Sequence, residues 1–201
     1  MNSPIWESLR RLTNDATNLG LRWALIGGMA VSARVEPRFT RDIDICVLVD
    51  ADADAEAVIA SFFQRGYTLD SLVEHEYLER LATVRLRPPV SEGMLVDVLF
   101  ASSGLEPEIT READQMQLVP GLTVPVARPA HLVVLKLLAR DDSTRPQDGA
   151  DLASLRPILT QQDKTEVRRL AHLVIERGFH RGRDLPTLAE DYLASPKSGN
   201  V

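Results

Sequence analysis

Two aspartates separated by one residue, Asp42 and Asp44, have the types and spacing that point most clearly to chemistry. They begin an alternating, β-branched segment that runs to Val49 and predicts a strand. Because successive side chains of a strand point to opposite faces, both carboxylates project from one face, about 6 to 7 Å apart along the backbone. Carboxylates at this spacing repel each other unless a cation lies between them. Mg²⁺ is the simplest such cation, because it prefers one or two carboxylates completed by water and substrate phosphates.

A third carboxylate, Asp97, lies in the middle of an apolar segment from Met94 to Phe100. An acidic residue there is costly to bury alone, so it needs a partner or a metal ion. If this segment is a strand beside the Asp42 strand, facing side chains come within about 5 Å at Cβ. Three carboxylates could then hold two metal ions, the arrangement that activates an attacking oxygen and shields a leaving group in phosphoryl chemistry. The hypothesis requires that all three converge and that no permanent cationic partner holds one of them.

A glycine pair, Gly27-Gly28, follows the apolar run from Trp23 to Ile26 and precedes Asp42 by thirteen residues. This pattern predicts a buried strand that turns into a helix. Glycines at such a turn let the backbone approach phosphate oxygens, and the helix N-terminus favours their negative charge. The pair is weak evidence alone, but with the two aspartates it indicates a nucleotide phosphate site.

These motifs together resemble the DNA polymerase β-like nucleotidyltransferase superfamily, whose signature is a hydrophobic residue, Gly-Gly or Gly-Ser, a short spacer, Asp-h-Asp or Asp-h-Glu, and a later strand Asp. The segment from Glu36 to Asp44 is similar to the bacterial AbiEii-type minimal nucleotidyltransferases, many of them toxins of toxin–antitoxin pairs. The run Leu135–Arg140 and the segment Arg145–Leu152 resemble that group's lysine helix and its Arg-x-x-Asp-x-x-Asp-Leu segment. The chain departs from the group at Gln147, where a lysine is frequent.

The resemblance implies an α+β fold: a mixed sheet with flanking helices, and a C-terminal helical bundle that forms the far wall of a cleft. It implies that Asp42, Asp44 and Asp97 bind metal and that Asp97 accepts the proton of the attacking group. The implied cofactor is Mg²⁺ or Mn²⁺, with a nucleoside triphosphate as substrate. The implied nucleotide-binding residues are Gly27, Gly28, Arg38, Arg41 and Lys136, and secondary candidates are Arg145, Asp148 and Asp151.

Simpler interpretations stand beside these. Lys136 lies in an apolar helical segment, where a lysine can extend along its stem to solvent without binding anything. Arg145, Asp148 and Asp151 have the spacing of a helix cap with local ion pairs. His131 and His75 lack the paired ligands of a zinc site in the sequence, which favours structural or exposed roles.

The elements that must position these residues follow from periodicity and turn residues. The predicted strands Tyr77–Leu86 and Met94–Ala101 are separated by a short turn, so they should pair antiparallel. The residues that follow them are predicted to form a hairpin and then only helices. The predicted helices are Ile5–Leu19, Met29–Val35, Ala55–Arg65, Ala130–Arg140, Asp148–Leu159, Lys164–Arg177 and Asp184–Leu193, and the predicted strands beyond those above are Tyr77–Leu86, Met94–Ala101 and a hairpin over Gln115–Val126. We expect a catalytic core over residues 1–127, a helical region over 128–195 and a tail over 196–201.

Composition limits the setting. The chain has 201 residues, 44% hydrophobic and 26% charged, with a net charge of -6, which argues against nucleic-acid binding over the whole surface. The stretch from Lys164 to Arg183 is rich in basic residues. It is either a local nucleic-acid-binding face or an ordinary solvated helix face. The single cysteine, Cys46, and the lack of an apolar span of about 18 residues or a signal peptide favour the cytoplasm, with no membrane partner.

The predicted reaction transfers a nucleoside monophosphate from a nucleoside triphosphate to an acceptor hydroxyl. The acceptor is a tRNA end or a protein side chain in a toxin with a cognate antitoxin, or a drug hydroxyl in an antibiotic-modifying enzyme. The alternative from another class is a nucleotide-binding or interaction module that kept the fold and lost turnover.

Overall fold

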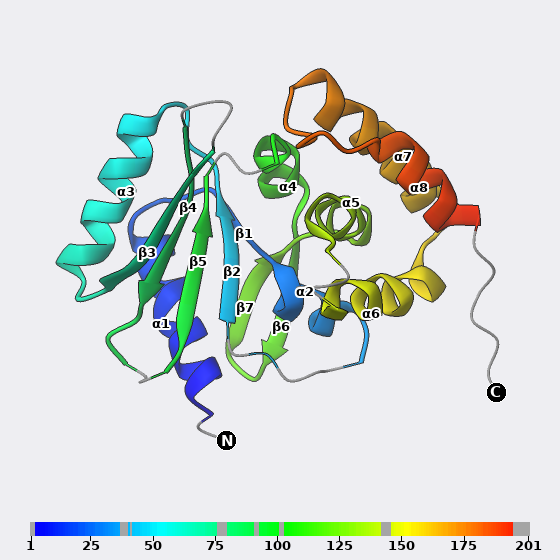
Figure 1. Cartoon of the computed structure of the whole chain (residues 1–201). Helices are drawn as coiled ribbons and strands as arrows, with labels where there is room; N and C mark the ends of the chain where they lie inside the picture. Colours follow the sequence, from blue (N-terminus) through cyan, green and yellow to red (C-terminus); the bar gives the residue numbers. More distant parts are fainter. Residues whose placement is uncertain are drawn as a thin grey trace.

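A mixed sheet of seven strands forms the centre of the computed structural model, which describes residues 3–36, 40, 42–75, 80–90, 93–100, 103–141 and 146–194 (Figure 1). The strand order is β3-β4-β5-β2-β1-β7-β6, so two of the neighbouring pairs, β5-β2 and β1-β7, join strands that are not consecutive in the chain. The strands are β1 (Trp23–Ile26), β2 (Asp42–Val47), β3 (Thr68–His75), β4 (Arg80–Arg87), β5 (Leu95–Leu99), β6 (Asp114–Val119) and β7 (Leu122–Val126). The predicted α+β class is confirmed.

The pairing at the centre of the sheet aligns the predicted acidic residues. Strand β2 runs parallel to β5 with Asp44 opposite Asp97, and it runs antiparallel to β1 on its other side. The predicted antiparallel pairing of β4 with β5 and the hairpin of β6 with β7 are both confirmed. The side chains of Ile43 and Ile45 are fully buried, as expected for the face of β2 opposite the aspartates.

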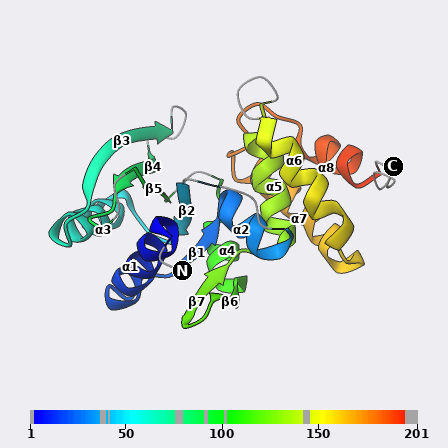
Figure 2. The ribbon, with the colours of Figure 1, turned by 90° about the horizontal axis from the view of Figure 1, so that it is seen from below.

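The helices lie on two sides of this sheet. Figure 2 shows α1 and α3 on one side of the molecule and α5 to α8 gathered on the other, with β1 and β2 between them. Helix α1 buries Leu9, Leu12 and Ala16, the apolar stripe that its sequence predicts. The helices are α1 (Pro4–Asn18), α2 (Gly27–Arg34), α3 (Asp52–Gln64), α4 (Glu106–Glu112), α5 (Pro129–Ala139), α6 (Pro146–Leu155), α7 (Gln161–Glu176) and α8 (Leu185–Ala194).

Two elements were not predicted from the sequence, and the boundaries of most predicted elements differ by a few residues. Strand β3 and the seven-residue helix α4 were missed, and the predicted strand over 77–86 begins instead at Arg80, with 77–79 outside the described residues. Helix α6 ends at Leu155 rather than Leu159. A 3-10 turn over Arg156–Ile158 follows, because Pro157 has no N–H with which to continue the helix.

None of the helices within the described ranges is long and apolar enough to cross a membrane. Cys46 is a free, fully buried thiol, and burial raises its pKa, as expected for a small core residue.

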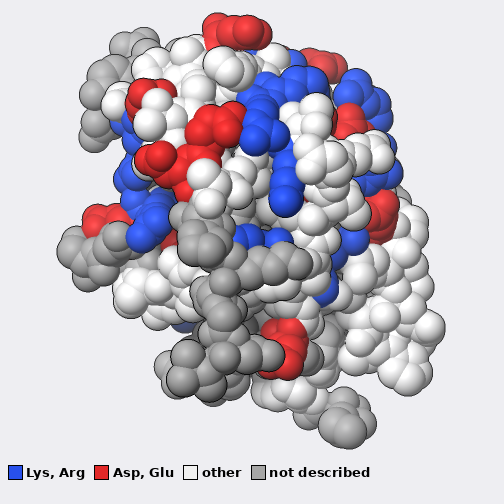
Figure 3. Space-filling view, turned by 90° about the vertical axis from the view of Figure 1, so that its right-hand side faces the viewer, with Lys and Arg blue, Asp and Glu red and all other residues white. Residues whose placement is uncertain are grey.

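The basic residues of the C-terminal helices lie beside acidic ones. Figure 3 views the molecule from the side of these helices and shows Lys and Arg side chains mixed with Asp and Glu. Arg168 binds Glu190 through two hydrogen bonds of 2.6 and 3.0 Å. Arg169 binds Glu166 in the same two-point manner. These two arginines of the predicted basic stretch are therefore already neutralised by carboxylates.

Candidate active site

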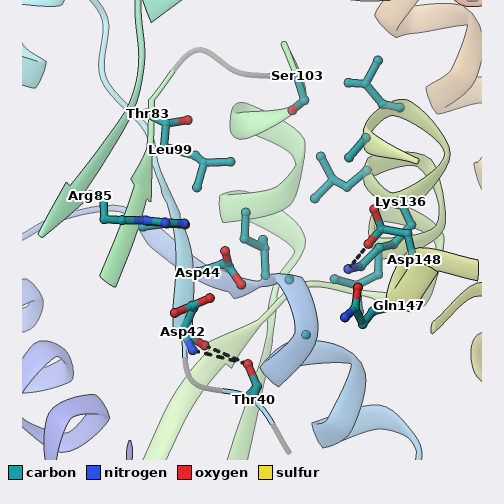
Figure 4. A pocket seen from close by; sticks show the side chains of 18 of the residues that line it. Thr40, Asp42, Asp44, Thr83, Arg85, Leu99, Ser103, Lys136, Gln147 and Asp148 are labelled. Carbon is teal, nitrogen blue, oxygen red and sulfur yellow. Dashed lines mark hydrogen bonds and ion pairs between the residues drawn. The ribbon is translucent and has the colours of Figure 1, made fainter. Parts of the chain in front are cut away.

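A cavity of about 690 Å³ lies between the sheet and the C-terminal helices (Figure 4). Asp42 and Asp44 point into it from β2, as the two-residue period of a strand requires. The wall opposite carries Lys136, from α5, and Asp148, from α6. A cavity of this size falls in the range of small-molecule sites, about 300 to 1,000 Å³. Its walls place carboxylates on one side and a lysine on the other.

Gly27 and Gly28 hold Asp44 in place. Gly27 has a φ of +65°, and a Cβ built on it would lie 2.0 Å from Oδ2 of Asp44. The backbone of Gly28 favours the charged form of the same carboxylate and lowers its pKa slightly. Any side chain at Gly27 would therefore collide with Asp44, and its backbone conformation is one that other residues rarely adopt. The glycine pair thus supports the carboxylate, a role that the sequence did not predict, and both glycines also line the cavity.

The carboxyl group of Asp44 has an environment that disfavours its charge. Burial, followed by the negative charge of Asp97, raises its pKa to about 6, although Lys136 acts in the opposite direction. A nearby divalent cation would offset this unfavourable environment. The donor set, carboxylate oxygens facing a polar cavity, suits Mg²⁺ or Mn²⁺. Asp42 and Asp44 therefore fit the predicted metal.

Asp97 has a partner that the sequence analysis missed. Arg85, on the neighbouring strand β4, stands opposite Asp97 in the sheet and donates hydrogen bonds of 2.7 and 2.6 Å to its two carboxylate oxygens. Both residues line the cavity, and the side chain of Arg85 is 38% exposed. The required convergence of carboxylates on one face is met. The second requirement, that none of the three carboxylates has a cationic partner, is not met at Asp97. A metal ion that binds Asp97 must displace Arg85 or share the carboxylate with it.

The spacing of the three carboxylates is also wider than in a compact metal cluster. The ligand atoms of the three aspartates do not all lie within 4.8 Å of one another. Within the described residues, a group that does meet this spacing is Glu112, His131 and Glu166. The side chain of Asp97 must therefore move closer before it can join Asp42 and Asp44 around one ion.

Lys136 is held by two acidic side chains from α6. Its Nζ lies 2.7 Å from Oδ1 of Asp148 and 2.8 Å from Oδ2 of Asp151. All three side chains are at most 13% exposed, so the interpretation of Lys136 as a lysine that extends to solvent is wrong. Asp148 and Asp151 fix the ammonium group at the cavity wall, which gives both a positioning role. Arg38, Arg41 and Arg145 lie outside the described residues.

The histidines divide between the described and undescribed parts of the chain. His131 is fully buried on α5, beside Glu112 and Glu166. Of the two roles expected for His131, structural or exposed, its burial excludes the exposed one, and folding places it beside two carboxylates that are far from it in the sequence. The side chain of His75 lies outside the described residues.

The site combines three features: aspartates in register on the parallel pair β2–β5, a glycine turn beside them, and a lysine across the cavity. Together they define a nucleotidyltransferase-type site. The model of the family described as "Nucleotidyl transferase AbiEii toxin, Type IV TA system" matches residues 9–198. The chain belongs to this family of nucleotidyltransferases.

Two of the three solved structures below, those with TM-scores above 0.5, share the fold of this chain. An antigenic nucleotidyltransferase-like protein from Paracoccidioides brasiliensis is 19% identical, with a TM-score of 0.51 over 95% of this chain and 94% of that one. The antibiotic-resistance factor ANT(2'')-Ia is 13% identical, with a TM-score of 0.51 over 96% and 95%. MenT4, a nucleotidyltransferase toxin from Mycobacterium tuberculosis H37Rv, is 19% identical, with a TM-score of 0.49 over 83% and 61%. None of the curated proteins that were compared matches the chain.

Proposed function

We propose that this nucleotidyltransferase uses Mg²⁺ or Mn²⁺ to transfer a nucleoside monophosphate from a nucleoside triphosphate to a hydroxyl group of an RNA end or a protein side chain. The observation that carries the proposal is the placement of Asp42 and Asp44 on one wall of the cavity and Lys136 on the other. Carboxylates suit the metal ions that accompany a triphosphate, and an ammonium group suits its phosphate oxygens.

In the proposed reaction the acceptor oxygen forms a bond to the α-phosphorus as the bond from that phosphorus to the bridging oxygen of the β-phosphate breaks. Pyrophosphate leaves, and the acceptor's proton passes to a carboxylate, for which Asp97 is the candidate. When bound, a metal ion would neutralise charge on the phosphates and make the acceptor oxygen more acidic. Asp42 and Asp44 would hold it, Gly27 and Gly28 keep Asp44 in position, and catalysis comes mainly from positioning and electrostatics.

The ion pair of Arg85 with Asp97 defines two states of the proposed site. While Arg85 donates to both oxygens, the charge of Asp97 is already neutralised, so Asp97 is a weaker metal ligand and a weaker base. When triphosphate and metal enter, the partly exposed guanidinium can turn toward the phosphate oxygens, which are stronger acceptors for a bidentate donor. Arg85 thus moves from a carboxylate to a substrate anion, and Asp97 becomes available.

The family name supports a toxin role, so we propose a cognate antitoxin as partner and a cellular macromolecule as acceptor. The alternative acceptor is a drug hydroxyl. The test is incubation of the protein with each α-labelled nucleoside triphosphate, Mg²⁺ and a total cell extract, followed by identification of the labelled species. Label on RNA or protein supports the proposal, whereas label on an added aminoglycoside or lincosamide alone would replace it with the drug-modifying alternative.

The control for this assay is Asp42→Asn, and separately Asp44→Asn. Each variant removes a proposed metal ligand while keeping side-chain size, so we expect pyrophosphate release to fall at least about 100-fold, as for the loss of one electrostatic stabiliser of a transition state. A folded variant that retains the wild-type rate would show that the carboxylates do not perform this chemistry.

The pairing of Arg85 with Asp97 also favours one second candidate, a nucleotide-binding module without turnover. Calorimetric titration with a nonhydrolysable triphosphate and Mg²⁺, beside the labelling assay, separates the two. Binding without labelling of any acceptor would favour the module.

A further inference from the structure

A second cluster of metal-ligating side chains lies outside the cavity. It combines Glu112, the last residue of α4, with His131 in the first turn of α5 and Glu166 in α7. One potential ligand atom from each residue lies within 4.8 Å of the other two. None of the three lines the active-site cavity. Figure 1 shows α5 between α4 and α7, so the cluster joins three helices that are far apart in the chain.

The imidazole of His131 is buried without hydrogen bonds. The residue is 0% exposed, and neither Nδ1 nor Nε2 has a hydrogen-bond partner. Its Nε2 lies 3.8 Å from Oε2 of Glu112, which is beyond hydrogen-bond distance. Buried polar atoms in folded proteins are nearly always satisfied, because leaving them without a partner is costly. A ligand that binds Nε2 between the two carboxylates would satisfy it.

The donor atoms of the cluster are of the kinds that metal ions bind. Burial lowers the pKa of His131, against the opposing effect of Glu112 and Glu166. The hydrogen bonds from Arg169 lower the pKa of Glu166. Imidazole nitrogens and carboxylate oxygens are both common ligands of divalent metal ions in proteins.

The arginines on the two carboxylates leave room for a cation. Arg111 donates to Oε1 of Glu112, while Oε2 is the oxygen that faces His131. Arg169 donates to both oxygens of Glu166, and each oxygen keeps a second lone pair. The side chains of Arg111 and Arg169 are 68% and 49% exposed, so both can shift into solvent as a metal enters.

We propose that Glu112, His131 and Glu166 form a zinc site that is separate from the Mg²⁺ site of the cavity. One imidazole nitrogen with two carboxylate oxygens suits Zn²⁺, whereas Mg²⁺ favours oxygen ligands alone. Bonds of about 2.0 to 2.2 Å to zinc require the ligand atoms to approach one another by about 1 Å. Side-chain rotation of the two partly exposed glutamates can supply that movement. A water molecule completes the fourth position.

The consequence is mechanical. Zinc would fix the end of α4, which follows the catalytic strand β5, to the helices α5 and α7. Lys136 lies on α5 five residues after His131, so the metal would steady the helix that carries the cavity's lysine. The site therefore strengthens the junction between the sheet and the C-terminal helices without contributing a group to the reaction.

The test uses the full chain after chelation and desalting, titrated with Zn²⁺ alone by calorimetry, with Co²⁺ absorption as a spectroscopic measure of ligand geometry. We expect one zinc ion per chain, an increase in melting temperature, and an intense visible absorption band with Co²⁺. Glu166→Gln and Glu112→Gln should each weaken zinc binding at least tenfold. His131→Gln is a further variant, whose folding is checked by its melting curve.

The matched control is Glu190→Gln. Glu190 forms the same two-point pair with Arg168 that Glu166 forms with Arg169, but it lies outside the cluster. This variant should bind zinc as the wild type does. Two results would overturn the proposal: no stoichiometric zinc binding, or binding that survives Glu166→Gln and is lost in the Asp42→Asn and Asp44→Asn double variant. The second result would place the zinc in the cavity.

Discussion

Oδ2 of Asp44 occupies the space in which residue 27 would place a side chain: a Cβ on Gly27 would lie 2.0 Å from it. The turn that precedes α2 and the second aspartate of β2 are thus fitted to each other. The position of this carboxylate depends on a residue that carries no functional group.

Gly27→Ala tests this relationship. We expect at least a tenfold loss of nucleotidyl transfer, because the methyl group displaces Asp44 from the cavity wall, and the positive φ adds strain of about 1 kcal/mol. Pyrophosphate release and urea unfolding measure the two effects. The matched control is Gly121→Ala, which shares the positive φ in the β6–β7 turn, but there an added Cβ would come no closer than 3.9 Å to Nη1 of Arg10. Equal activity losses in both variants would contradict the fitted arrangement.

Arg85→Ala tests the competition between Arg85 and the metal for Asp97. Without divalent cations, we expect a loss of about 1 to 3 kcal/mol in the free energy of unfolding, because Asp97 is buried and loses its charged partner. With Mg²⁺, the apparent affinity for the ion should rise several-fold, because its competitor is gone. Chemical unfolding in chelator and Mg²⁺ titration monitored by melting temperature provide the two measurements.

Arg87→Ala is the control on the same strand. Arg87 pairs with Asp70 outside the cavity, and its side chain is 54% exposed. Such a surface pair contributes about 0 to 1 kcal/mol, so this variant should change stability little and Mg²⁺ affinity not at all. Mg²⁺ binding that weakens in Arg85→Ala would contradict the competition.

Lys136→Met tests the clamp formed by Asp148 and Asp151. The variant leaves two buried carboxylates without their cation, and removing one partner of a buried ion pair costs about 3 to 5 kcal/mol. Adding Asp148→Asn and Asp151→Asn should restore part of the stability but none of the transfer activity. Urea unfolding of the single and triple variants, beside the labelling assay, measures both. Full activity in the triple variant would remove Lys136 from the proposed triphosphate contacts.

The ion pair between Glu108 and Arg177 predicts a pH dependence. Burial of Glu108 is the largest single effect and acts to raise its pKa, but the hydrogen bonds and charge of Arg177, a backbone hydrogen bond and the charge of Arg111 together outweigh it, so the pKa is lowered from its ordinary value of 4.5. The stabilisation is therefore present above about pH 4.5, the unfolded-state value, and is lost as pH falls through the lower folded-state pKa. We expect Glu108→Gln to lower stability by about 1 kcal/mol at pH 7, and the difference from the wild type to shrink below pH 4.5. Unfolding curves at pH 7, 5 and 4 measure this, and a difference that grows as pH falls would contradict it.

The sequence predicted the features that depend on local periodicity. The alternation of Asp42, Ile43, Asp44 and Ile45 placed both carboxylates on one face, and the apolar segment around Asp97 indicated a buried neighbouring strand. Both follow from the two-residue period of a strand and the cost of burying charge, which short stretches of sequence reveal.

The features that the sequence did not reveal depend on pairing between distant elements. Arg85 has no mark in the sequence that separates it from Arg87, and only the register of β4 on β5 places it against Asp97. The contact of Asp148 and Asp151 with Lys136 required knowing that α6 packs on α5, although the spacing of the two aspartates was noted. Strand β3 escaped prediction because, at the sheet edge, it does not need a continuous apolar face.

The in-register pairing of β2 with β5 has a consequence for how errors in folding would appear. A slip of one residue in β2 would turn Asp42 and Asp44 toward the core and Ile43 and Ile45 toward the cavity. Charged groups in an apolar interior would make such a species unstable. The hydrophobic packing that stabilises the fold therefore also fixes the register that places Asp42 and Asp44 in the cavity. A soluble, inactive population with β2 out of register should not accumulate.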